Sequence, residues 1–264
     1  MLNTNPFSIL AESMSPVVMQ YFIIAMIILI AAGTIIQMIN HKNLTYFLAN
    51  AKKAKLAATK ELSIGEKSSI IAKTTVVDIG TTSELGFGKR RLAHVLGMYG
   101  TILFWISSAV LVFCYTGADK SNSETWSLLW HVGAILTCLG GYWFWFFLRV
   151  DVLAEAHPWY RIIKADLFVL ALLACATFGL AWSYTQFNGQ TGLGYLFFTL
   201  FVLSNIILFG GVYWSKFAHM FYKPGAAIQK NLAEADGSRD NLPPPADAPE
   251  QFGLGIKREE PKHY

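Results

Sequence analysis

Residues 167–215 read LFVLALLACATFGLAWSYTQFNGQTGLGYLFFTLFVLSNIILFGGVYWS and contain no Asp, Glu, Lys or Arg. A helix that crosses the hydrocarbon core of a bilayer needs roughly 20 mainly apolar residues. This run is therefore long enough for two crossings. The polar, glycine-containing segment 186–192 lies near its middle and predicts the turn between them.

Three more runs without these charged residues precede it, at 13–41, 92–118 and 125–148. The whole chain is 54% apolar and only 14% charged, which excludes the usual composition of a soluble globular domain. We therefore predict an all-α integral membrane bundle. Its five transmembrane helices are expected near residues 16–39, 92–115, 126–148, 165–185 and 193–217.

The basic residues predict the orientation of this bundle. Of the 21 Lys and Arg, only Lys120 falls on the side opposite to the other 20. Because basic residues are retained on the cytoplasmic face, the N-terminus is expected outside and the C-terminus in the cytoplasm. Residues 1–15 contain no Lys or Arg, so a cleavable signal is not expected and the first helix should remain attached.

Four segments follow from this topology. They are a periplasmic N-terminus with the first span (1–41), a cytoplasmic basic loop (42–91), a four-helix membrane core (92–223), and a cytoplasmic proline-rich tail expected to be disordered (224–264).

Two parts of the basic loop carry a pattern of their own. Residues 44, 47, 48 and 51 share one helical face, typical of a helix that leaves the membrane or lies on it. The β-branched segment 68–80 can form a short hairpin or pair with a partner's edge strand. The alternative for the whole loop is a solvated connector without a partner.

Two histidines stand at the membrane boundary in similar settings. His94 lies in RRLAHVLGMYG (90–100) and His219 in WSKFAHMFYKP (214–224). Since their helices run in opposite directions, both histidines are expected at the inward level of the bilayer. We predict that these imidazoles ligate one b-type haem, with Arg90, Arg91 and Lys216 neutralising its propionates.

Other interpretations stay open for these residues. Histidines at a membrane boundary also occur simply as interfacial polar groups. Gly97 and Gly100 leave room for a macrocycle beside His94, but intramembrane glycines more often allow bare helix–helix contact. The two cytoplasmic histidines, His41 and His157, are further candidates as ligands.

The remaining polar groups of the spans give weaker signals. His131 lies at outer depth, where it can bond a quinone carbonyl or, as we prefer, another helix. The cysteines, at 114, 138 and 175, form no Cys-x-x-Cys cluster and are expected to be packing residues. No charged side chain lies deep in a span, which disfavours a transporter or channel.

The two histidine motifs, together with five spans and an outward N-terminus, resemble a group of membrane cytochromes b. This group includes the gamma subunit of respiratory nitrate reductase and the membrane subunits of heterodisulfide reductase-like complexes. Within it, residues 90–230 are most similar to the membrane anchor of dissimilatory adenylylsulfate reductase, with SKFAHMFYKP as the strongest motif. The resemblance implies a redox subunit in the bacterial inner membrane, not an enzyme by itself. It would exchange electrons between a cytoplasmic iron–sulfur flavoprotein and membrane quinone.

The chain departs from that group at one point. The nitrate reductase gamma subunit carries a second pair of histidines higher in the membrane, whereas this chain has phenylalanine there, near Phe104 and Phe201. An outer haem is therefore not expected by that route. A cofactor-free structural anchor, held to its enzyme by the basic loop and tail, is the alternative function.

Overall fold

The computed structural model describes residues 1–40, 42–85, 88–116, 123–150, 157–215, 217, 219–239, 251–252 and 256–257. The chain divides into two compact units. The first, here called the membrane unit, comprises Met1–Gln37 and Lys89–Ala218. The second, here called the basic unit, comprises Met38–Gly88 and His219–Tyr264.

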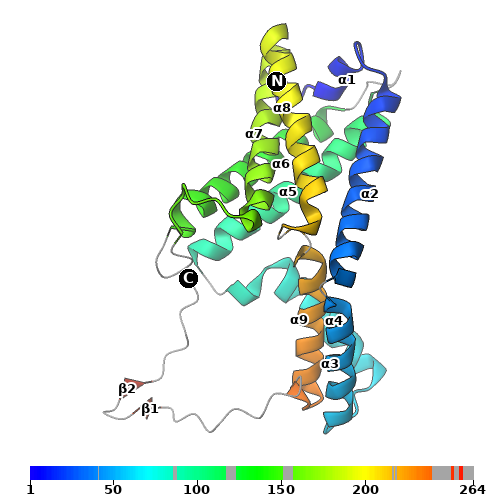
Figure 1. Cartoon of the computed structure of the whole chain (residues 1–264), viewed down its shortest axis with the longest axis vertical. Coiled ribbons are helices and arrows are strands. Elements are labelled where there is room, and N and C mark those ends of the chain that lie inside the picture. Colours follow the sequence, from blue (N-terminus) through cyan, green and yellow to red (C-terminus); the bar gives the residue numbers. More distant parts are fainter. Residues whose placement is uncertain are drawn as a thin grey trace. The chain divides into compact units, whose positions relative to one another are not determined.

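Five helices are long and apolar enough to cross a membrane, which confirms the predicted all-helical bundle with five spans (Figure 1). The first begins in the membrane unit and its last residues belong to the basic unit. The spans are α2 (Pro16–Asn40), α5 (Lys89–Cys114), α6 (Glu124–Trp143) continued by the π-helical turn η3 (Phe144–Leu148), the short turn η4 (Lys164–Asp166) with α7 (Leu167–Phe187), and α8 (Thr191–Gly210) with η5 (Gly211–Tyr213).

The last span ends earlier than the sequence predicts. Its α-helix stops at Gly210 and one further turn, η5, reaches Tyr213 instead of residue 217. Two adjacent glycines, Gly210 and Gly211, have the largest backbone entropy to lose and the weakest preference for a helix. The apolar run continues past them, so hydropathy alone placed this end four residues too late.

Glycines bring α5 and α6 into direct backbone contact. A Cβ atom built on Gly100 would lie 2.5 Å from the backbone nitrogen of Thr137, and one on Gly133 would lie 2.6 Å from that of Phe104. Small residues allow helices in a membrane to approach this closely, where packing and not hydrophobicity drives association. The hydroxyls of Thr101 and Thr137 lie 3.4 Å apart along the same seam.

Aromatic side chains fill the interior of the membrane unit. Trp130 is completely buried and packs against Phe104, with ring centroids 5.1 Å apart. Phe7, from the short N-terminal helix α1 (Pro6–Leu10), meets both Trp130 and Trp182 edge-on at 5.9 and 5.4 Å. The N-terminal segment is thus part of the core of this unit.

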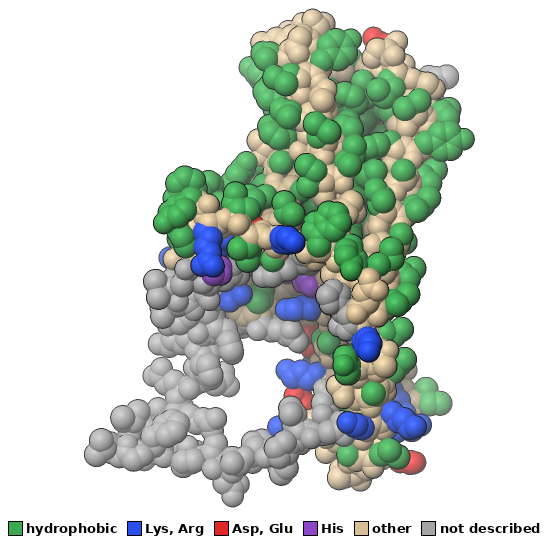
Figure 2. All heavy atoms as spheres, in the orientation of Figure 1, with side chains coloured by type: hydrophobic (Ala, Val, Ile, Leu, Met, Phe, Trp, Pro, Cys, Tyr) green, Lys and Arg blue, Asp and Glu red, His purple; other side chains and the backbone are tan. Residues whose placement is uncertain are grey.

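The outer surface of the spanning helices is apolar and exposed. Along α2 only Met19 and Met26 are buried, while side chains such as Tyr21 and Ile28 are 68% and 60% exposed. Figure 2 shows hydrophobic side chains over the visible surface of α2 and α8. Exposed apolar helices of this length are what a lipid-facing surface requires.

The basic unit is also helical. It contains α3 (Asn43–Ala57), α4 (Ile64–Lys73), the π-helical turn η1 (Thr74–Gly80), the turn η2 (Ser83–Leu85), α9 (His219–Ala235), and the two-residue strands β1 (Gln251–Phe252) and β2 (Ile256–Lys257), which pair antiparallel.

The hairpin predicted for residues 68–80 is wrong, because this segment continues a helix. The Ser63 hydroxyl accepts a hydrogen bond from the backbone N–H of Glu66, and the Glu66 carboxylate accepts one from the N–H of Ser63. This capping box starts α4, and the helix then carries the β-branched residues into η1. Tertiary contact with α9 overrides their preference for strands.

The beginning of the tail folds too, so the prediction of disorder from residue 224 is wrong as far as Ala235. The Asn231 side-chain amide donates to the Thr74 hydroxyl and to the Asp78 carboxylate, each at 2.7 Å. The backbone N–H groups of Thr59 and Lys60 donate to the carbonyl of Asp236. The loop and the first part of the tail therefore form one folded body instead of two separate segments.

Candidate functional site

The N-terminal turns of α5 bring together three of the predicted haem-binding residues. The helix begins at Lys89, three residues earlier than predicted, so Arg90, Arg91 and His94 are all helical. Residues three and four positions apart are neighbours on a helix surface. His94 is exposed and the two arginines are half-buried, so an imidazole and two guanidinium groups occupy one side of the end of this helix.

His219 lies in a different setting from the one expected. The sequence places it at the inward end of the fifth span, but that helix stops at Tyr213 and His219 is the first residue of α9 in the basic unit, where it is half-buried. Its pairing with His94, which belongs to the membrane unit, stays a prediction. Lys216 and His41 lie outside the described residues.

Phe217 marks where the chain leaves the membrane unit. This fully buried ring stacks on Trp105 with centroids 5.8 Å apart, and it meets Phe168 edge-on at 5.2 Å. Trp105 is eleven positions after His94 in α5, or roughly 16 Å along the helix at 1.5 Å per residue. Aromatic packing therefore holds Phe217, which follows the fifth span, beside Trp105. Along α5 this level lies about three helical turns beyond His94.

The glycines beside His94 have separate uses. Gly100 is buried against α6, where a Cβ would also approach the carbonyl of Gly133 to 2.9 Å. A Cβ on Gly97 meets nothing within 4 Å. Gly100 therefore serves bare helix–helix contact, the commoner of the two interpretations. Gly97 differs in that a side chain there would point into open space, although its backbone nitrogen also lies close to Gly140 of α6.

The two phenylalanines at the depth where a second haem would need histidines, Phe104 and Phe201, belong to the aromatic core. Phe104 is 1% exposed and Phe201 7% exposed, and their rings meet at 6.4 Å. Phe201 also stacks on Trp182 at 5.7 Å. These rings take up the volume between α5, α7 and α8 at that depth.

His131 bonds another helix, as the preferred interpretation predicts. The ring is completely buried; Nδ1 lies 2.7 Å from the carbonyl of Ser127, and Nε2 lies 2.8 Å from the hydroxyl of Ser183 in α7. Since a carbonyl can only accept, Nδ1 carries the proton and Nε2 accepts from the serine. Both ring nitrogens are used within the bundle, which makes His131 a structural link between α6 and α7.

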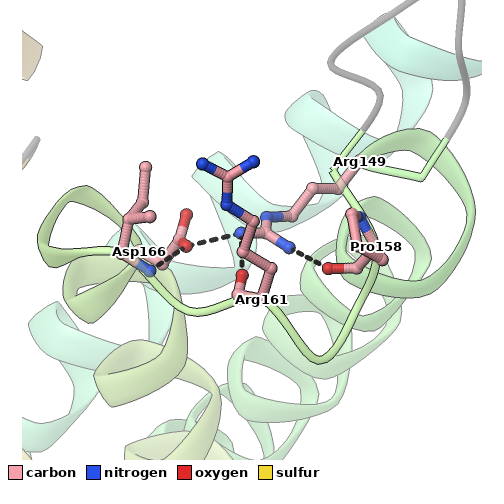
Figure 3. Close-up of polar contacts among 5 residues, drawn as sticks. Arg149, Pro158, Arg161 and Asp166 are labelled. Carbon is pink, nitrogen blue, oxygen red and sulfur yellow. Dashed lines mark hydrogen bonds and ion pairs between the residues drawn. The ribbon is translucent and has the colours of Figure 1, made fainter.

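The sequence reasoning missed a buried ionic cluster at the turn between the third and fourth spans (Figure 3). Arg149 is completely buried and pairs with Asp166. Its guanidinium also donates to the carbonyl of Pro158 at 2.9 Å and to that of Arg161, and it lies 4.2 Å from the centroid of the Trp145 ring. One arginine thereby fixes both ends of the turn.

A sequence signal for this cluster exists in retrospect. Arg149 directly follows the apolar run of the third span, and Asp166 directly precedes that of the fourth. A cation and an anion at facing ends of adjacent helices can pair, and a buried charge requires such a partner. His157, which is half-buried, lies beside this pair because its backbone N–H donates to the carbonyl of Arg149 at 3.0 Å.

Among the described residues, no three or more His, Cys, Asp or Glu side chains are grouped as a metal centre would need. A bis-histidine haem needs only two axial ligands. The five long apolar helices define a multi-pass helical membrane protein. Compared with protein-family models, curated proteins and solved structures, the chain matches none.

Proposed function

We propose that this protein is the membrane anchor and electron-transfer subunit of a respiratory complex. It would connect a cytoplasmic iron–sulfur flavoprotein, most closely an adenylylsulfate reductase working in sulfite oxidation, to the quinone pool through one b-type haem. The observation that supports this best is the exposed His94 next to Arg90 and Arg91 at the end of a spanning helix.

The proposal gives each predicted residue a role toward the iron or the propionates of the haem. The imidazoles of His94 and His219 would be the axial ligands, each neutral and each needing a hydrogen-bond partner for its second nitrogen. Arg90 and Arg91, with Lys216, would neutralise the propionates. The open space at Gly97 favours the approach of a flat group to this side of α5. The bound haem would supply a one-electron carrier near the cytoplasmic surface.

The proposed location is the bacterial inner membrane, with the N-terminus outside and the basic unit in the cytoplasm, against anionic lipid headgroups. Trypsin tests this orientation in sealed vesicles. Right-side-out vesicles should protect Lys52, Lys53 and Lys55, and inverted vesicles should lose them. Cleavage from the outer side alone would reverse the topology and remove the argument for a cytoplasmic haem.

The haem itself is tested by a dithionite-reduced minus oxidised visible spectrum of the purified protein, followed by reduction with a quinol. A b-type band pair that also appears with quinol supports the proposal. A purified, folded protein without these bands, obtained from haem-sufficient cells, contradicts it.

A cofactor-free anchor is the second candidate, and two observations favour it. Gly100 is used for helix–helix contact instead of making room for a macrocycle, and the loop and tail form a folded basic unit. Such an anchor would bind the same flavoprotein and show a blank difference spectrum.

A further inference from the structure

The turn between α3 and α4 exposes more apolar surface than a solvated loop needs. Ile64 is 85% exposed and Leu56 is 80% exposed, the two highest values for large hydrophobic side chains among the described residues. Only eight positions separate them in the chain, one at the end of α3 and one at the start of α4. We call residues 56–64 the α3–α4 tip.

This tip is held in one conformation by bonds on both sides. The carbonyl of Asp236, just after α9, accepts hydrogen bonds from the N–H groups of Thr59 and Lys60 at 2.9 and 3.1 Å, and from the Thr59 hydroxyl at 3.2 Å. Gly237 then turns the chain with φ of +78°, in a place where a side chain would collide with Thr59. The backbone of the tip is thus fixed by the C-terminal end of α9.

The α4 side is fixed as well. Beyond the capping box with Ser63, Glu66 pairs with the Lys60 ammonium at 2.6 Å. The hydrogen bond from Lys60, followed by those from Ser63, lowers the pKa of Glu66 to about 2. The pair therefore stays ionised at neutral pH. An exposed apolar group on a preorganised backbone loses little entropy when it binds, which favours a role in binding.

The surroundings of the two apolar side chains are basic. Residues 52–67 contain five lysines and two glutamates, and all seven are exposed. One glutamate, Glu66, is already paired with Lys60. A small apolar centre with a charged rim is the anatomy of a protein–protein interface. A lipid-binding segment would instead need a continuous apolar face. The exposed apolar side chains earlier in α3, such as Leu44 and Leu48, are separated from Leu56 along the chain by the lysines at 52, 53 and 55.

We infer that the α3–α4 tip is the docking point for an acidic surface of the soluble iron–sulfur flavoprotein, with Leu56 and Ile64 inserted at the centre of the contact. This inference rests on the proposed function for the identity of the partner. Lysines of the rim would attract the acidic surface from a distance, and the apolar pair would set how long the complex lasts.

The test uses the full chain in nanodiscs and a purified dissimilatory adenylylsulfate reductase as the soluble probe. Binding is measured by interferometry for wild type, Leu56→Glu, Ile64→Glu and the milder Ile64→Ser. Val76→Glu is the matched control, since Val76 is 68% exposed in the same unit but lies in η1. A resistance to trypsin equal to wild type shows that each variant keeps the basic unit folded.

We expect each Glu substitution at the tip to raise Kd by roughly tenfold or more, as for a central interface residue, and Ile64→Ser to raise it by less. The control should bind like wild type, and wild-type affinity should fall as salt rises. Equal Kd values for Ile64→Glu and Val76→Glu would overturn the inference, as would a wild-type chain that does not bind the probe.

A lipid-bound tip has a different signature. A fluorophore attached at residue 64 would then be quenched by spin-labelled lipid in nanodiscs without any partner, and this result would also overturn the inference. The visible spectrum of the same nanodiscs reports the haem independently. A loss of docking with haem still bound can therefore be told apart from a missing haem with docking intact.

Discussion

Gly100→Ala should weaken the membrane unit, whereas Gly97→Ala, one turn away on the same helix, should not. A Cβ at residue 100 would lie 2.5 Å from the Thr137 nitrogen, 2.8 Å from the Leu136 Cβ and 2.9 Å from the Gly133 carbonyl oxygen. Ordinary contact begins near 3.4 Å, so α5 and α6 would have to separate by roughly an ångström. Two of the three obstacles are backbone atoms, which cannot rotate away as a side chain does.

The magnitude follows from two opposing terms. Forcing one extra methyl group into a packed interior costs typically about 1–3 kcal/mol. Replacing Gly by Ala inside a helix returns up to about 1 kcal/mol. With the full gain, Gly100→Ala should therefore lower the free energy of unfolding by up to about 2 kcal/mol. Gly97→Ala meets nothing within 4 Å and should leave it unchanged or raise it slightly.

The assay is reversible unfolding in mixed micelles by increasing the mole fraction of dodecyl sulfate, followed by the loss of helical circular dichroism. Both variants are made in the same background, so that differences in the denatured state largely cancel. If Gly97→Ala and Gly100→Ala unfolded at the same mole fraction, the close contact of α5 and α6 along this seam would be wrong.

Three further outcomes are expected. Arg149→Ala should cost about 3–5 kcal/mol in the same unfolding assay, because it leaves a buried carboxylate without its partner; a loss below about 1 kcal/mol would contradict a buried pair. In the basic unit, hydrogen bonds from Ser83 and Asn231 lower the pKa of Asp78 below its ordinary 3.8. Its contribution to stability is thus present above that value and lost as pH falls through the lowered pKa. Pepsin cleavage of α9 should rise over this acidic range in wild type but show no such step in Asp78→Asn, and identical profiles would refute this linkage. His131→Ala should cost about 1–3 kcal/mol by leaving a buried hydroxyl unpaired, yet leave any low-spin haem signal unchanged; loss of that signal would show that His131 serves the haem.

The number and type of the spanning helices could be predicted from the sequence because the bilayer imposes one requirement on every span. Runs without charge, as in 125–148, must become helices wherever they cross hydrocarbon. The end of the last span could not be placed in this way. A pair of glycines, Gly210 and Gly211, ends that α-helix within a run that stays apolar. A hydropathy scale does not include the low helix preference of glycine, so it could not locate this end.

The parts outside the spans were less predictable since they depend on tertiary contacts. The segment 68–80 looks like a strand by residue type, but Asn231, more than 150 positions later, bonds Thr74 and Asp78 and holds them in a helix. No local pattern contains that partner. The same is true of Arg149, a charged residue at the end of an apolar run, which is nevertheless completely buried by the turn it organises.

The candidate site was predictable in part for the same reason. Arg90, Arg91 and His94 lie together because four residues make about one helical turn, which is a local property. Pairing His94 with His219 joins positions 125 residues apart in two separate units. That pairing stays a prediction, because no local pattern of the sequence brings the two histidines together.

The most direct test compares the haem signals of wild type, His94→Ala, His219→Ala and the double variant by visible and paramagnetic-resonance spectroscopy of membranes, normalised to protein level. If both imidazoles ligate one iron, each single change should abolish the low-spin signal, because one remaining imidazole leaves an axial position open. The double change should then lose little more than either single one, whereas independent roles give small, additive effects. A full bis-histidine spectrum retained by His94→Ala would contradict the proposed site and leave His41 and His157 as the next ligands to examine.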